Sequence, residues 1–276
     1  MLKSLLDRLA RGPVAVPDAL WESTLASVPF LARLTAAERA RLRVCAGQLL
    51  GSKQMSGAAG LELTAAMQLN IAVQACLPIL HLGLDWYQGW SSIVVYPGEF
   101  LVPRSITDEA GVVHEYTDTI SGEAWDGGPV LLSWDDAQRA STELGNAYSV
   151  VIHEFTHKLD LLNGDADGIP PFASALHPDL APSDWHAALS DAYESFVAEL
   201  ELVESELPAS LDPESGEADA FYAHLPLDAY AGQDHGEFFA VSSEAFFVEP
   251  QRLQAAFPDW YRLLAAFFRQ DPIGAR

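Results

Sequence analysis

A fifteen-residue stretch, Asn146–Asp160, restricts the fold of this 276-residue chain more than any other part of its sequence. It contains the pattern His153-Glu154-x-x-His157, with a largely apolar segment before it and leucines after it. On an α-helix, side chains four positions apart share a face, whereas Glu154 is turned toward the next face. We therefore expect a helix over residues 148–162 that buries an apolar side. On its other side the two imidazoles can reach a single ion.

The rest of the sequence changes its hydrophobic period twice. Helical spacing marks residues 20–55, within which Thr35 and Glu38 form a capping box, and residues 64–82. Short runs rich in β-branched and aromatic residues then predict a small sheet with antiparallel pairs, at 93–96, 100–102, 112–120 and 130–134. Further helices are expected at 135–144, 182–203, 236–248 and 250–269, with loops at 164–171 and 208–219.

These elements predict an α+β protein that is mainly helical, with a small mixed or antiparallel sheet. The composition, 49% apolar and 20% charged, is that of a packed globular protein and excludes a disordered or collagen-like chain. We expect one domain over residues 1–276, in which 1–85 form a helical part and 86–276 contain the sheet and the motif helix. The two cysteines, Cys45 and Cys76, could form at most one disulfide bond, which is too few to stabilise so large a fold. This low number suits a reducing compartment.

No segment of the sequence has the character of an export signal or a membrane span. Charged residues interrupt the leucines of residues 1–16. The most apolar internal segment, 70–82, contains Gln74 and Pro78 and is shorter than the roughly 20 residues that cross a bilayer. The expectation is a soluble, cytoplasmic protein without membrane contact.

The charge of the chain is strongly uneven. The formal net charge is −24, and the segment Leu159–Gln251 has twenty acidic residues and no lysine or arginine. Such a surface repels phosphate backbones, so nucleic-acid binding through this half is not expected. It could attract a metal ion or the amino terminus of a peptide, although most of these carboxylates are expected simply to be solvated.

The two histidines of the motif predict a catalytic zinc site. Zinc polarises a carbonyl and lowers the pKa of water, and Glu154 is placed to accept the proton of that water as general base. A catalytic zinc ion has three protein ligands and one open position, so a third ligand is required. The ligand types favour zinc without excluding nickel or cobalt.

The strongest candidates for the third ligand are Glu237 and Glu244, which lie seven residues apart on one stripe of an aromatic helix. Carboxylates among so many phenylalanines are costly to bury unless they are paired or bind a metal, so one of them is the expected ligand. Asp160 returns to nearly the same face as His153, but its short side chain favours a supporting or helix-end position. The weaker candidates are loop residues: His177, Asp165 and Asp167.

Several blocks of the sequence, in order, carry a family resemblance: Phe30–Thr35, Gly60–Thr64, Gln74–Leu80, Leu82–Tyr87, Gly128–Trp134, Val151–Asp160 with Asn163–Asp165, and Glu237–Phe247. They resemble the Mlc titration factor A family of zinc-dependent peptidases, whose catalytic region is similar to that of anthrax lethal factor. The resemblance implies a zincin-like metallopeptidase fold. The acidic 208–219 loop is longer than the family pattern, which affects access to the site rather than its chemistry.

Carried over by position, the resemblance implies that His153, His157 and Glu237 bind zinc and that Glu154 is the general base. Glu244 then becomes a residue that orients a ligand histidine. The family has a tyrosine shortly before the ligand glutamate, and Tyr230 matches it; its hydroxyl would donate a hydrogen bond to the oxyanion of the intermediate. The alternative for Tyr230 is an aromatic residue packed in a loop.

The resemblance also implies an activity and a partner. The family is associated with aminopeptidase activity and with binding the repressor Mlc, which controls sugar uptake, so a peptide substrate and a repressor of this type are the expected partners. The alternative is a regulatory protein that titrates a transcription factor and keeps zinc only for structure. The presence of Glu154 favours chemistry, because a structural site needs ligands but no general base. A sheet edge at the predicted strand 93–96, if it lay beside the motif helix, would let a peptide add as an extra strand.

Overall fold

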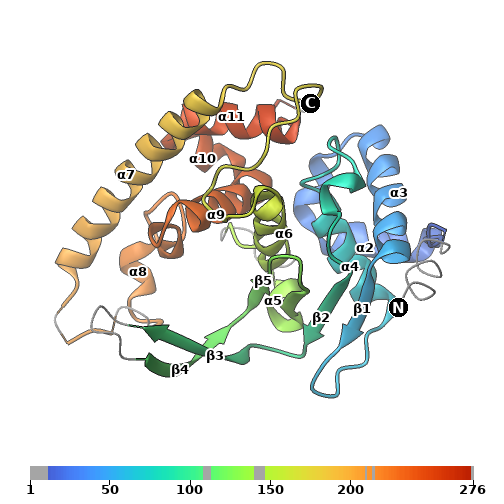
Figure 1. Cartoon of the computed structure of the whole chain (residues 1–276), viewed down its shortest axis with the longest axis horizontal. Coiled ribbons are helices and arrows are strands. Elements are labelled where there is room, and N and C mark those ends of the chain that lie inside the picture. Colours follow the sequence, from blue (N-terminus) through green and yellow to red (C-terminus); the bar gives the residue numbers. More distant parts are fainter. Residues whose placement is uncertain (1–11, 108–112, 140–146, 209, 213–214, 275–276) are drawn as a thin grey trace.

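The computed structural model describes residues 12–107, 113–139, 147–208, 210–212 and 215–274, with the backbone alone for the part of 103–119 that is included. Helix α6 (Val150–Asp160) lies near the centre, between α9 (His235–Val248) and the N-terminal helices, and the strands run along one side of this arrangement (Figure 1). The motif helix therefore has protein on several sides.

The helical region expected over residues 20–55 consists of three elements, α2 (Asp18–Ser27), η1 (Pro29–Arg33) and α3 (Ala36–Ser52), and its last two residues belong to a strand instead. Pro29 starts the second, and the predicted capping box starts the third, because Thr35 accepts from the Glu38 amide and Glu38 accepts from the Thr35 amide at 2.8 Å. Helix α4 (Ala65–Cys76) is buried over most of its surface, as its sequence indicates.

The main sheet has the order β1-β2-β6-β5 and is mixed. Strands β1 (Gln54–Gly57), β2 (Ser92–Tyr96) and β6 (Val130–Ser133) are parallel, and β5 (Gly122–Ala124) runs antiparallel to β6 at the edge. The expectation of antiparallel pairs is thus only partly correct. It missed β1 and β5, which are short and contain glycine or polar residues, so no hydrophobic pattern marks them.

Strands β3 (Phe100–Thr107) and β4 (Val113–Ile120) pair only with each other in the described part of the chain. They form an antiparallel two-stranded sheet beyond the main one (Figure 1). Residue 112, which the sequence assigned to this strand, lies outside the described residues. Since β4 ends two residues before β5 begins, the chain passes directly from this hairpin into the edge strand of the main sheet.

The second half is helical, as expected. The elements not yet given are η2 (Leu84–Tyr87), α5 (Trp134–Arg139), η3 (Leu161–Asn163), α7 (Pro182–Glu206), α8 (Asp219–Tyr222), η4 (Ala229–Gly232), α10 (Pro250–Ala256) and α11 (Pro258–Phe268). The helix predicted over 250–269 is split because Pro258 starts a new helix and cannot continue the old one. Residues 140–144 of the predicted 135–144 helix lie outside the described residues. No helix of the described part has the length and apolarity to span a bilayer.

Aromatic packing fixes the two central helices. Trp185 of α7 is fully buried, with its ring centroid 4.7 Å from that of Trp260 and 5.7 Å from that of Phe239 on α9. On α6, the Phe155 ring meets Tyr87 at 5.1 Å and Trp90 at 5.6 Å. Side chains carried by α6 and α9 are therefore held on well-packed supports.

Candidate metal and active site

Helix α6 presents the motif as the sequence predicts. Ser149 caps its first turn, since the side-chain oxygen accepts a hydrogen bond from the Ile152 amide at 3.2 Å. The residues between the two histidines pack into the core, and the side chains of His153 and His157 each retain 12% exposure. One face of this buried helix therefore remains within reach of solvent.

Helix α9 brings the third side chain from 80 residues further along the chain. Asp234 caps this helix by accepting from the Glu237 amide at 2.9 Å, which fixes Glu237 in its first turn. Every residue of α9 except His235 and Glu237 is buried. Glu237 thus stands where α9 meets the open face of α6.

Three ligand atoms converge at this point. The Nε2 atoms of His153 and His157 lie 3.1 Å apart, and Oε2 of Glu237 lies 3.1 Å from the first and 3.3 Å from the second. Donors bonded at about 2.0–2.1 Å to a tetrahedral ion lie about 3.3–3.4 Å from one another. Among the described residues, this is the one group of three histidine, cysteine or acidic side chains close enough to hold a metal ion.

The charges at this point suit a cation. Burial lowers the pKa of His153, but its bonds to Glu237 and Glu244 outweigh burial and hold the pKa well above the usual value. Burial also raises the pKa of Glu237, and the two imidazoles outweigh it and lower that pKa far below its usual value. Both pKa shifts have the same cause: the carboxylates stabilise positive charge on the imidazole side of the group, as they would stabilise a bound cation. The donor set fits a divalent metal ion.

Glu244 lies behind His153 rather than beside the other ligand atoms. Its Oε1 is 2.8 Å from Nδ1 of His153, and its Oε2 accepts from the Ser149 amide at 2.5 Å. The Ser149 hydroxyl donates in turn to Oε1 of Gln74 on α4 at 2.9 Å. Residue spacing alone left open which of the two glutamates faces the metal, and the family resemblance favoured Glu237. Neither pointed to Ser149 and Gln74, because no spacing rule relates α4 to α9.

Glu154 is 5% exposed and lies against edge strand β5. Burial raises its pKa to about 7, although the neighbouring histidines act in the opposite direction. Such a pKa is suited to a group that takes up and releases a proton near neutral pH. The sequence predicts the orientation of Glu154 toward a second face but not the strand that covers it.

Tyr230, on η4, lies near the same site. Its ring centroid is 6.0 Å from that of His153, and the residue is 45% exposed. The rings are tilted by 53°. Tyr230 therefore lies beside a histidine of the motif and is partly open to solvent.

The other sequence candidates do not join the group. Asp160 is fully buried at the end of α6, where Oδ2 accepts from the Gly168 amide at 2.7 Å, so it anchors the following loop. His177 is buried elsewhere, and its Nε2 lies 2.9 Å from the carbonyl oxygen of Phe267. Asp165 and Asp167 are exposed in the loop.

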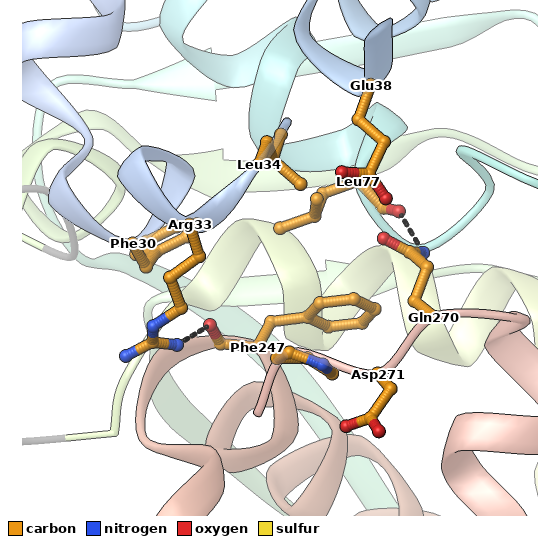
Figure 2. Close-up of a pocket in the computed structure, with 9 residues that line it drawn as sticks. Phe30, Arg33, Leu34, Glu38, Leu77, Phe247, Gln270 and Asp271 are labelled. Carbon is orange, nitrogen blue, oxygen red and sulfur yellow. Dashed lines mark hydrogen bonds between the residues drawn. The ribbon is translucent and has the colours of Figure 1, made fainter. Parts of the chain in front are cut away.

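A separate hollow lies between the N-terminal helices and the ends of α9 and α11 (Figure 2). Phe30, Leu77 and Phe247 are among its apolar lining residues. Its polar groups are engaged with the main chain: Arg33 donates to the carbonyl oxygen of Phe247 at 2.9 Å, and Gln270 donates to that of Leu77 at 2.9 Å. These two hydrogen bonds satisfy carbonyl groups at helix ends and link the N-terminal part of the fold to the C-terminal part. The hollow shares no residue with the histidine site.

Comparison with known proteins agrees with this geometry. Residues 5–269 match the family described as glucose-regulated metallo-peptidase M90. The chain is 37% identical to Mlc titration factor A of Klebsiella pneumoniae over 257 residues, covering 93% of this chain and 88% of that protein. It is 37% identical to the proteins of that name from Salmonella arizonae, over 92% of each chain, and Serratia proteamaculans, over 95% of this chain and 90% of the other. The chain therefore belongs to the Mlc titration factor A family of M90 metallopeptidases.

Proposed function

We propose that this protein is a zinc-dependent peptidase that hydrolyses short peptides or protein termini. The observation that carries the proposal is the convergence of His153, His157 and Glu237 within 3.3 Å of one another, next to the buried Glu154. Membership of a metallopeptidase family supports it. Two buried, free cysteines, Cys45 and Cys76, suit the cytoplasm as its location.

Each residue of the site has a chemical task in this proposal. His153, His157 and Glu237 hold the ion, which when bound supplies Lewis-acid chemistry by polarising a carbonyl and acidifying water. Glu154 accepts the proton of the attacking water and passes it to the departing amine. Tyr230, on the open side of His153, donates a hydrogen bond to the oxyanion of the tetrahedral intermediate.

Strand β5 offers a place for the peptide, whereas the 93–96 strand considered from the sequence is β2 and has a partner strand on each side. Strand β5 lies at the edge of the main sheet and packs against α6, so a peptide added along its open side passes close to Glu154. The acidic segment that supplies α7 and α9 attracts a positively charged amino terminus. The strand edge supports a peptide substrate, and the acidic segment supports an aminopeptidase.

The direct test combines metal analysis with a substrate panel. Purified protein is expected to contain zinc and to hydrolyse chromogenic amino-acid amides and short peptides. A chelator should abolish the hydrolysis, and added zinc should restore it. Activity that survives complete removal of the metal would contradict the proposal.

Glu244→Gln should weaken zinc binding by about 10–100-fold, because one amide oxygen cannot serve both the His153 ring and the Ser149 amide. The measurement is competition with a chromogenic zinc chelator. The matched control is Ser243→Ala on the same helix, whose hydroxyl donates to the Phe239 carbonyl instead. Equal zinc affinity in the Glu244 variant and the native protein would remove Glu244 from the site.

Tyr230→Phe should lower kcat by about 10²-fold and leave KM and stability nearly unchanged, since the variant loses a hydrogen bond made in the transition state. Its exposure makes a change of more than about 0.5 kcal/mol in the free energy of unfolding unexpected. Tyr222→Phe on α8 is the control. A kcat equal to that of the native protein would make Tyr230 only a packed loop aromatic.

A second function, binding a repressor of the Mlc type, is favoured by the name of the relatives, Mlc titration factor A. Such binding does not require Glu154. We therefore expect the native protein and Glu154→Gln to bind a purified repressor of this type with equal affinity. Isothermal titration calorimetry separates the two functions, and no measurable binding by either protein would remove the second one.

A further inference from the structure

We propose that Gly122 is a positioning residue for this reaction: its missing side chain leaves the space that holds the Glu154 carboxylate in place. The inference rests on the proposed function only in taking Glu154 as the general base. An alanine Cβ at position 122 would lie 2.7 Å from Cγ and 2.8 Å from Cδ of Glu154. Both distances are shorter than real Cβ contacts allow, so the glutamate side chain would have to move.

Space, rather than backbone conformation, explains the glycine. Gly127, in the turn after the edge strand, has a φ of +58° and needs glycine for its conformation. Gly122 is not among the glycines with positive φ and lies in a regular strand, opposite Leu132 of β6. A glycine inside a strand often marks a close approach by another group, and here that group is the Glu154 side chain.

A second contact of α6 holds the edge strand at this distance. Lys158 follows Glu154 by one helical turn and is 3% exposed. Its ammonium group donates to the carbonyl oxygens of Trp125, just after β5, and of Gly128, the latter at 3.0 Å. The chain just after the end of β5 is thereby tied to α6, while the bare α-carbon of Gly122, at the start of β5, lies against Glu154. The gap between helix and strand is therefore fixed rather than adjustable.

The first measurement compares Gly122→Ala with the native protein. We expect kcat on a chromogenic peptide to fall by about 10–100-fold, because a base displaced by about 1 Å no longer meets its proton in line, while KM and zinc content change little. The matched control is Gly216→Ala, whose Cβ would have only an ordinary contact, 3.8 Å from Asp219. A native kcat in Gly122→Ala would overturn the inference.

The second measurement is a double-mutant cycle in thermal stability and needs no hydrolysis. Gly122→Ala should lower the Tm of the metal-free protein by roughly 2–10 °C, because it overpacks a filled site. In a Glu154→Ala background the added methyl enters vacated space, so the same change should lower the Tm by much less. An equal loss in both backgrounds would overturn the inference, because the strand itself would then be the cause.

The two measurements also separate this inference from the proposed function. If the native protein hydrolyses no peptide, the proposed function fails, while the stability cycle still decides whether Gly122 makes room for Glu154. If Gly122→Ala does not fold, Gly122→Ala combined with Glu154→Ala carries the test. A folded double variant supports the contact, and an unfolded one overturns it.

Discussion

Replacing Glu154 by glutamine should lower kcat by about 10²–10⁴-fold while the protein keeps its zinc. Glutamine has nearly the same shape but accepts no proton, and the three converging ligand atoms belong to other residues. The measurements are steady-state kinetics on the best substrate of the panel and elemental analysis of the same preparation. Glu249→Gln, at the end of α9, is the control and should behave as the native protein does.

The same variant has a second readout in metal-free protein. Burial raises the pKa of Glu154 from its ordinary 4.5 to about 7. Between these pH values the folded state keeps a proton that the unfolded state has lost, so the free energy of unfolding falls as the pH rises. At pH 8 this penalty is complete in the native protein and absent from Glu154→Gln. The metal-free variant should therefore unfold at a higher temperature at pH 8, and this difference should shrink toward pH 4.5.

The two readouts have different consequences. Full hydrolytic activity in Glu154→Gln would rule out Glu154 as the general base, whatever the zinc content. An unchanged difference in Tm between pH 4.5 and pH 8 would show that Glu154 is ionised without cost in the folded protein. Loss of activity together with loss of zinc would mean that the residue supports the metal rather than the proton transfer.

Replacing Glu237 by glutamine should abolish activity by removing the metal. In the proposed site the carboxylate supplies one of the three ligand atoms and a negative charge that would balance the ion. The loss of zinc affinity should exceed the roughly 10–100-fold expected for Glu244, which contacts the ring of a ligand histidine rather than the metal position. Elemental analysis after gel filtration measures the retained zinc.

Thermal unfolding with and without zinc gives an independent check of Glu237. A ligand that binds only the folded protein raises its Tm. The native protein and the control Glu204→Gln, on α7, should both show this rise, and Glu237→Gln should show little or none. A full rise in Glu237→Gln would mean that the ion has another third ligand, and the arrangement proposed for α6 and α9 would be wrong.

The motif helix and the helix carrying Glu237 could be predicted from the sequence because their signals are local. Four-residue spacing brings His153 and His157 to one face of α6, and the phenylalanines around Glu237 mark a buried helix. Convergence of the three side chains in space could not be derived in this way. It depends on how α6 and α9 pack, and before the structure the family resemblance was the ground for preferring Glu237 over Glu244.

The edge of the sheet escaped prediction for a different reason. Strand β5 has three half-buried residues, Gly122 among them, so it lacks both the alternating pattern and the β-branched side chains that reveal a strand. The parallel pairings of β2 with β1 and with β6 were not predicted either. Strand β1 comes from the end of a region with helical spacing and pairs with β2 across 38 residues. Such pairings are set by tertiary packing, which a local pattern does not contain.

The hydrogen bonds that run from His153 through Glu244 and Ser149 to Gln74 join parts of the chain that are made at very different times during translation. Gln74 is made long before Glu244. A nascent chain therefore has both histidines of α6 long before it has the carboxylates that hold and orient them. The three converging side chains can therefore come together only after α9 has been made and has packed against α6.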